Sequence, residues 1–260
     1  MFDLAALDRA LAGTVFAGKL HFLPATGSTN SDALAAARVG AAHGSVFYAD
    51  EQTAGRGRGD HAWHSAAGQG LYVSVVLRLP FSAARLPLLP LATGLAAAEA
   101  IRTASGLTVD LRWPNDLLIG PRKTGGVLVE TQTDSGLPSF AVAGIGINVH
   151  QQRFATAMDT PATSLDLESG RWIDRQPLLI ALLESLEREA RALAGPAAPN
   201  IPARVMQSSS WVRGRRVAVH GPQACVGVSE GLDDDGFLLV RTAAGLVRVQ
   251  SGGIRAAETD

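Results

Sequence analysis

The segment Gln-Thr-Ala-Gly-Arg-Gly-Arg-Gly at residues 52–59 has the residue types and spacing that point most clearly to chemistry. Glycines alternate with Arg56 and Arg58, and glycine accepts backbone angles that let successive N–H groups converge on an anion. The guanidinium groups add planar, permanently charged donors for carboxylate or phosphate. A Walker A loop is excluded, because no lysine and hydroxyl residue follow the last glycine. We expect an anion-binding loop; the alternatives are a flexible surface turn and an RGG-like nucleic-acid segment.

The run Arg-Trp-Pro-Asn-Asp at residues 112–116 is a second candidate. Pro114 disfavours a helix and makes Trp113 extended, so Asn115 and Asp116 are predicted at a bend between two strands. Such a bend can present an amide and a carboxylate to a ligand or to Mg²⁺. The alternative is an ordinary Asn-Asp turn beside a packed tryptophan.

Two further segments combine a polar residue with glycines next to an apolar strand. Lys123 is followed by Gly125 and Gly126, an arrangement in which a lysine can approach a phosphate, although such a lysine is often only solvated. The run Gly-Ile-Gly-Ile-Asn at residues 144–148 ends a predicted strand with small residues and the amide of Asn148. It predicts either a ligand wall formed by backbone or a tightly packed strand end.

A cluster of small polar residues marks a predicted helix start. Ser28, Thr29 and Asn30 follow a glycine and precede an alanine-rich stretch. The first N–H groups of a helix are available to a ligand, and these side chains supply both donors and acceptors. A plain helix cap is the alternative, and the two roles are compatible.

The elements expected to position these residues form an α/β arrangement over residues 1–208. Apolar periodicity predicts helices at 2–11, 28–40, 88–104 and 178–193, and strands at 20–23, 45–49, 71–79, 109–112, 117–119, 126–133 and 140–147. Residues 71–79 alternate as a half-buried strand does. Residues 194–202 resemble a linker, and four short β-like runs within 209–260 predict a small antiparallel barrel.

Composition limits the classes of protein to consider. The chain has 260 residues, 47% of them hydrophobic, and a formal net charge of -1, so no global field draws it to nucleic acid or to an anionic membrane. Cys225 is the one cysteine, which rules out an internal disulfide. Asp60, His61 and His64 lack the further partners that a zinc site needs. No signal peptide or membrane span is evident, so we expect a cytoplasmic protein.

Together and in this order, the five segments resemble the biotin–protein ligase (biotin–acetyl-CoA-carboxylase ligase) family. The resemblance extends over residues from about 22 to 255. It implies a mixed β-sheet with helices packed over one face, then an SH3-like barrel with glycines at its turns. It also implies an enzyme that uses ATP and Mg²⁺ to activate biotin as biotinyl-5′-AMP. That enzyme then transfers biotin to a lysine of a biotin carboxyl carrier protein or domain.

The resemblance assigns roles to individual residues. Ser28, Thr29 and Asn30, helped by Gln52, would contact the ureido ring of biotin. The biotin carboxylate and later the adenylate would be held by the arginine loop. Lys123, Arg58 and Asp116 would be catalytic, with Lys123 on the carboxyl oxygen and the α-phosphate. Other residues of the biotin and adenylate site would be Gly55, Arg56, Gly57, Trp63, Gly125 and Gly126. The ATP and Mg²⁺ end would include Asn115, Asp116 and Asn148.

Two features depart from the usual pattern of the family. The loop continues as Gly-Asp-His-Ala-Trp at residues 59–63, where many relatives carry more arginine, so we expect looser retention of the adenylate. Arg112 replaces the usual lysine before Trp-Pro-Asn-Asp, which keeps the charge but changes the geometry. We further expect residues 154–164 to act as a second closing element.

The N-terminal region bears on the other activity known in the family. Some relatives carry an N-terminal helix-turn-helix domain of about sixty residues and repress biotin genes. Fewer than thirty residues precede Ser28. We therefore expect a ligase without repressor function and no nucleic-acid or membrane partner.

The sequence leaves two alternative functions and the oligomeric state undecided. A lipoate or octanoate ligase or transferase would share the fold type and the carrier lysine, but it would require a longer apolar groove and would not need Ser28–Asn30. A non-catalytic RNA-binding module would use the arginine loop and the barrel as its platform. Whether the chain forms a homodimer is not specified.

Overall fold

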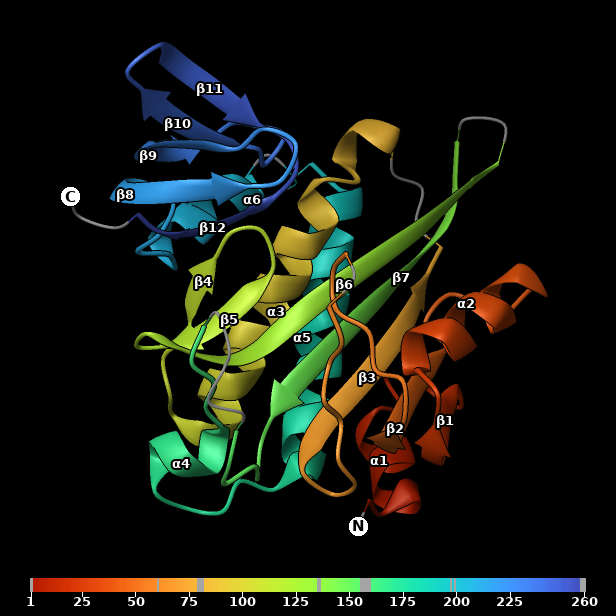
Figure 1. Ribbon diagram of the computed structural model, residues 1–260. Coiled ribbons are helices and arrows are strands. Elements are labelled where there is room, and N and C mark those ends of the chain that lie inside the picture. Colours follow the sequence, from red (N-terminus) through yellow and green to blue (C-terminus); the bar gives the residue numbers. More distant parts are fainter. Residues whose placement is uncertain are drawn as a thin grey trace.

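The computed structural model describes residues 2–59, 61–78, 82–134, 137–154, 160–196, 198 and 200–257. Its strands form two sheets, and helices pack against them (Figure 1). The first sheet has the order β1-β2-β3-β7-β6-β5-β4, and only its β1–β2 pair is parallel, so it is mixed as predicted. Its strands are β1 (Leu20–Thr26), β2 (Val46–Gln52), β3 (Gly70–Leu77), β4 (Asp110–Arg112), β5 (Asp116–Ile119), β6 (Arg122–Asp134) and β7 (Leu137–Asn148).

The second sheet is antiparallel, with the order β11-β10-β9-β8-β12. Its strands are β8 (Arg213–His220), β9 (Cys225–Leu232), β10 (Leu238–Thr242), β11 (Gly245–Val249) and β12 (Gly253–Ala256). The α-helices are α1 (Leu4–Ala10), α2 (Thr29–Arg38), α3 (Leu88–Ser105), α4 (Leu165–Ser169), α5 (Arg175–Ala194) and α6 (Asn200–Gln207), with a short 3₁₀ turn at Ala83–Arg85. Among the described residues, no helix has the length and apolar character that a membrane crossing requires.

Helices cover both faces of the first sheet. In Figure 1, α3 and α5 lie behind the sheet, and their apolar residues join Val73 and Val75 of β3 in the main core. Successive strand residues point to opposite faces, so Val76 faces the other way, where it packs with Ala33 and Ala37 of α2. The whole of β3 is therefore buried, and the prediction of a half-buried strand was wrong. The resemblance implied helices packed over one face, which α3 and α5 do, and α2 adds a helix on the second face.

The segment predicted as a linker is partly helical. Helix α5 ends at Ala194, and from Asn200 the chain forms α6, which packs on α3 and β9 with Ile201 and Val205 buried. Pro202 lies in the first turn of α6, where its missing N–H costs no helical hydrogen bond. The proline-rich composition was a poor guide here because the helix is short and obtains its stability from packing.

The second sheet is attached to α3 through a tight turn. Gly236 has φ 84°, and a Cβ there would lie 2.7 Å from Leu91 Cδ1 of α3, so only glycine permits this approach. The carbonyl of Gly236 also accepts a hydrogen bond from Trp113 Nε1 at 3.1 Å. Val217 and Leu238 of the second sheet belong to the same core cluster as α3. The two sheets thus share one apolar core.

Candidate active site

A cavity of about 1070 Å³ lies between the α2 face of the first sheet, the segment after β2 and the second sheet. In Figure 1 this segment, drawn in orange, runs in front of β6 and β7. The structure thus brings together residues from five separated stretches of sequence. The predicted site residues that line the cavity are Ser28, Thr29, Asn30, Gln52, Arg56, Gly57, Arg58, Trp63, Asn115, Asp116, Lys123, Gly126 and Asn148.

The floor of the cavity consists of strand backbone. Gly126 of β6 pairs with Gly146 of β7, and Gly144 lies two residues before Gly146 on the same face. A Cβ at Gly144 would lie 2.1 Å from Asn30 Oδ1, and one at Gly146 would lie 2.6 Å from Trp63 Nε1. The glycines predicted to form a ligand wall therefore allow neighbouring side chains, and any ligand in the cavity, to come close to the strand backbone.

Two predicted site glycines do not line the cavity. A Cβ at Gly55 would lie 2.3 Å from the carbonyl oxygen of Trp63, and one at Gly125 would lie 2.8 Å from that of Gly146. Both positions need glycine because backbone packs against backbone. The structure gives these two residues a supporting place behind the cavity wall.

The arginine loop folds back on itself as a narrow hairpin. Gln52 N–H donates to Ser65 O at 3.0 Å, and Trp63 N–H donates to Gly55 O at 2.8 Å. Gly57 N–H donates to His61 O at 2.7 Å. The glycine-rich backbone was expected to direct its N–H groups at an anion, but that of Gly57 is used inside the hairpin. Asp60, in the atypical second half of the loop, lies outside the described residues.

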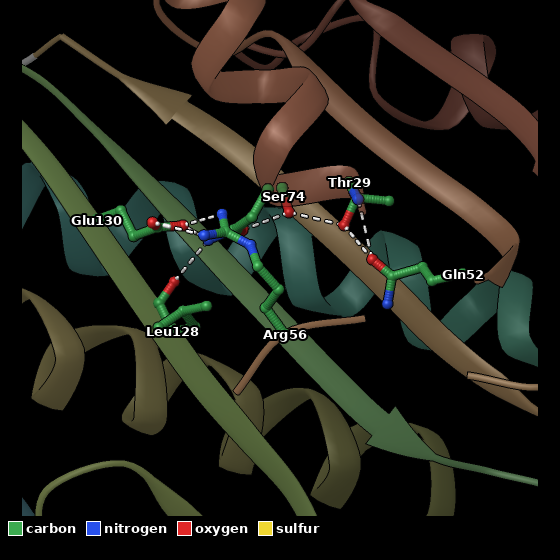
Figure 2. Close-up of polar contacts among 7 residues, drawn as sticks. Thr29, Gln52, Arg56, Ser74, Leu128 and Glu130 are labelled. Carbon is green, nitrogen blue, oxygen red and sulfur yellow. Dashed lines mark hydrogen bonds and ion pairs between the residues drawn. The ribbon is translucent and has the colours of Figure 1, made fainter. Parts of the chain in front are cut away.

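One end of the cavity is formed by uncharged side chains joined by hydrogen bonds, most of them buried. Thr29 donates from its N–H and its hydroxyl to Gln52 Oε1 at 2.9 and 3.0 Å, as Figure 2 shows. Ser74 Oγ lies 2.8 Å from Thr29 Oγ1 and donates to Asn30 Oδ1 at 2.6 Å. Ser28 is the N-cap residue of α2, as predicted, although its side chain makes no capping bond. This end offers fixed, neutral polar groups.

The opposite end of the cavity carries charge. Asp116 Oδ1 lies 2.5 Å from Lys123 Nζ, and its Oδ2 lies 2.6 Å from Arg112 Nη2. Burial alone would raise the pKa of Asp116, but the charges of Lys123 and Arg112 outweigh it and hold that pKa below its ordinary value. Lys123 Nζ also lies 5.6 Å from the centre of the Trp63 ring. The bend predicted between β4 and β5 is the element that places Asp116 here.

Arg58 connects the charged end to the second sheet. Its Nη2 donates to the carbonyl oxygen of Gly252 at 2.5 Å, immediately before β12. Burial lowers the pKa of Arg58, and the charge of Asp116 partly offsets that effect. The second sheet thus forms part of the cavity wall, through the turn that follows β8 and the segment that leads into β12.

Lys123 is fixed through its backbone by the start of the segment that leads to α4. Its N–H donates to Pro161 O at 2.8 Å, and its carbonyl accepts from Thr163 N–H at 2.9 Å. Asn148 Nδ2 donates to Thr163 O at 3.0 Å. Residues 155–159 of the predicted closing element lie outside the described residues. The described end of that element supports Lys123.

The residues expected at a Mg²⁺ site are already engaged. Both oxygens of Asp116 are ion-paired, and Asn148 Oδ1 accepts from Gln151 Nε2 at 3.3 Å. The described part of the chain contains no group of three His, Cys, Asp or Glu residues placed to hold a metal. Asp116 and Asn148, as arranged, do not fit a protein-held metal centre.

Sequence reasoning missed three contributors to the site. Ser74 is the one serine in the largely apolar strand β3, and Glu130 is a lone charge in the central part of β6. Ser74 interrupts an apolar run and Glu130 directly follows one, and these polar residues in largely apolar strands are the signal that could have identified them. The carbonyl of Gly252 carried no sequence signal, because its role depends on how the second sheet is placed.

Comparison with known proteins agrees with this geometry. Residues 26–148 match the biotin/lipoate A/B protein ligase family, and residues 213–254 match the biotin protein ligase C-terminal domain. A biotin–[acetyl-CoA-carboxylase] ligase of Mycobacterium tuberculosis is 35% identical over 246 residues, which cover 91% of this chain and 88% of the relative. The bifunctional ligase/repressor BirA of Bacillus spizizenii is 32% identical over 244 residues, covering 87% of this chain and 70% of the relative.

Solved structures give the same answer for the fold. The biotin protein ligase of Aquifex aeolicus in complex with biotin and ATP matches with a TM-score of 0.79 and 27% sequence identity, over 92% of this chain and 98% of the other. An R40G variant of that enzyme with biotin matches with a TM-score of 0.80 and 28% identity, over 92% and 99% of the two chains. By the identity and coverage of these relatives, the chain belongs to the biotin protein ligase family.

Proposed function

We propose that the chain is an ATP-dependent biotin–protein ligase whose reaction takes place in the cavity between the two sheets. The observation that carries this proposal is the contrast between the cavity's ends. Buried neutral donors and acceptors lie at the start of α2, and a cluster of three cations around Asp116 lies at the other end. A molecule with an uncharged polar ring and a carboxylate that becomes attached to a phosphate matches both ends.

The neutral end would bind the ureido ring of biotin. Thr29, Asn30 and Gln52 are held by one another and by Ser74, so their positions are set before the ligand arrives. Buried polar groups with fixed partners discriminate against ligands that leave them unpaired. Ser28 lies at the start of the same helix, 4% exposed, and would complete this end.

The first step joins biotin to AMP. A biotin carboxylate oxygen attacks the α-phosphorus of ATP, the bond from that phosphorus to the bridging oxygen breaks, and pyrophosphate leaves with the bonding electrons. Lys123 and Arg58 would stabilise the charge that gathers on the phosphoryl oxygens. The arginine loop, with Arg58 at the charged end, would hold the carboxylate and later the adenylate, and Trp63 and Gly126 would line the path between the two ends.

The second step transfers biotin to a lysine of a biotin carboxyl carrier protein or domain. The neutral ε-amine attacks the carboxyl carbon of the mixed anhydride, AMP leaves with the electrons of the broken C–O bond, and the nitrogen loses a proton to solvent. Asp116 was predicted to be catalytic, but a carboxylate whose pKa is held low is a weak acceptor for that proton. We assign Asp116 a different task, which is to orient Lys123 toward the α-phosphate.

The nucleotide would lie at the charged end. Asn115 and Asn148 would line this end with fixed side chains: Asn115 Nδ2 donates to Val127 O at 2.8 Å, and Asn148 holds the segment beside Lys123. Mg²⁺ commonly enters such sites with the phosphates and keeps several waters. Asp116 is already paired with Lys123 and Arg112, and Asn148 Oδ1 with Gln151, so no step is assigned to a metal held by these two residues.

The division into residues 1–208 and 209–260 is proposed as a functional one. The first part would supply the biotin end and Lys123, and the second part would close the nucleotide end through the region around Gly252. The matched ranges 26–148 and 213–254 support this division.

Biotin-dependent exchange of radiolabel between pyrophosphate and ATP tests the proposal. We expect exchange with biotin and none with lipoate or octanoate, followed by biotin transfer to a carrier-domain lysine. Exchange that depends on lipoate instead would establish the rival ligase. The absence of exchange, together with salt-dependent RNA binding, would support the non-catalytic alternative.

A further inference from the structure

The two arginines of the loop make different contacts. Arg58 donates to the second sheet, whereas the guanidinium of Arg56 is held by Glu130 of β6. Arg56 Nη1 donates to Glu130 Oε1 at 3.1 Å, and Nη2 donates to Oε2 at 2.6 Å, a two-pronged ion pair (Figure 2). Such paired contacts fix the direction of both groups as well as their distance.

Glu130 lies behind Arg56 as seen from the cavity. Arg56 is among the lining residues, and Glu130 is not. The same carboxylate accepts from Asn30 Nδ2 at 2.8 Å. Glu130 therefore joins the arginine loop to the start of α2, which carries the neutral end of the cavity.

The hairpin geometry explains why one ion pair can position the loop. Arg56 and Arg58 are two residues apart on one arm, with Gly57 paired to His61 between them. Arg56 attaches the arm to β6 of the first sheet, and Arg58 attaches it to the segment before β12. Loss of the Arg56 attachment leaves the arm held at one side only.

We propose that Glu130 is a positioning residue that latches the arginine loop over the cavity by holding the Arg56 side chain. This inference rests on the proposed function, because the cargo beneath the loop is biotinyl-5′-AMP. The latch keeps Arg58 at the charged end and slows escape of the adenylate. The side chain of Arg56 then acts on the loop, and Arg58 acts on the ligand.

A double-mutant cycle on adenylate release tests the latch. Biotinyl-5′-AMP formed by the enzyme is followed as it dissociates from the unaltered protein, E130Q, R56Q and the double variant. Glutamine keeps the shape of Glu130 and its oxygen for Asn30 but removes the charge. We expect each single change to speed release about fivefold, as for a partly exposed ion pair, and the double variant to be no faster than either. Melting temperature should stay unchanged throughout.

A matched pair elsewhere provides the control. Glu230 and Arg241 form the same two-pronged contact in the second sheet, at 2.8 Å for both bonds, away from the residues that line the cavity. E230Q should leave adenylate release unchanged. An unaltered release rate in E130Q, or rate effects that multiply in the double variant, would overturn the latch. Failure of the unaltered protein to catalyse biotin-dependent exchange would overturn the function itself, and the latch with it.

Discussion

The two ends of the cavity achieve order by different physical means. At the start of α2, neutral groups satisfy one another through short hydrogen bonds, and Ser74 at their centre is completely buried. Around Asp116, order comes from one carboxylate shared between two cations, with a third cation, Arg58, nearby. A neutral network has a strict geometry and no net field, whereas the charged cluster has a field that acts on any anion. The first arrangement suits recognition, and the second suits stabilisation of charge that develops during a reaction.

The largest expected effect is that of removing the central cation. Lys123→Ala should lower biotin-dependent ATP–pyrophosphate exchange about 10²–10³-fold, the usual loss when one charge-stabilising group is removed. Biotin affinity measured by calorimetry should change little, because the neutral end is intact. The neighbouring Arg122, whose half-exposed side chain pairs with Glu168, supplies the control. If Lys123→Ala weakens biotin binding as much as it slows exchange, recognition and charge stabilisation are not separated between the two ends of the cavity.

Loss of the cation that bridges to the second sheet should come next. Arg58→Ala should keep the fold but shorten the half-life of bound biotinyl-5′-AMP roughly thirtyfold, the lower range for truncating a buried partner of a charge. Arg213→Ala, at an exposed position on β8, is the matched control. An unchanged half-life of bound biotinyl-5′-AMP in Arg58→Ala would contradict the assignment of the arginine loop to the charged end.

A smaller and opposite pattern is expected at the neutral end. Ser74→Ala leaves Asn30 Oδ1 without its donor, and it should raise KM for biotin about tenfold while kcat stays within about twofold. Ser229, also buried and bonded to the backbone of Arg215, provides the control in the second sheet. A fall in kcat with unchanged KM would reverse the roles assigned to the two ends.

The smallest effect concerns pH and stability at the charged end. The pKa of Asp116 lies below its ordinary value of 3.8, so its ionised form stabilises the fold at higher pH. That contribution is complete above pH 3.8 and disappears as pH falls through the lowered pKa. The difference in unfolding free energy between the unaltered protein and Asp116→Asn should therefore be constant at neutral pH and shrink only in stronger acid. Urea titrations at a series of pH values measure it; a difference that grows on acidification would contradict the ion-pair assignment.

The sequence singled out residues that lie close together, but it missed parts of the structure that supports them. Alternating glycine and arginine, or a lysine before two glycines, are local patterns whose chemistry is visible without a fold. Most of those residues do line one cavity. The helix α6 was missed because its stability comes from packing against α3 and β9, which no local pattern records. The double burial of β3 was missed for a similar reason, since α2 covers the second face from a distant stretch of chain.

The chemistry of individual loop atoms was also beyond reach of the sequence. Alternating glycines indicated N–H groups free for an anion, yet Gly57 donates to His61. Arg56 and Arg58 alternate with glycines, which indicated one shared task, yet Arg56 pairs with Glu130 and Arg58 with a backbone carbonyl. These hydrogen bonds depend on which acceptors the tertiary structure places near each donor of the loop, and local sequence does not record that placement.

The glycine floor formed by β6 and β7 also determines how the substrate range of this cavity could be altered by engineering. A wall made of backbone contains no side chain to shorten, so Gly126, Gly144 and Gly146 offer no added room, and a Cβ at Gly144 or Gly146 would collide with the side chain of Asn30 or Trp63. Biotin analogues enlarged on the side that faces this floor should not bind, because no substitution at the three glycines makes room for them. Room can be created only on the opposite walls, where Thr29, Gln52 and Trp63 have atoms to remove.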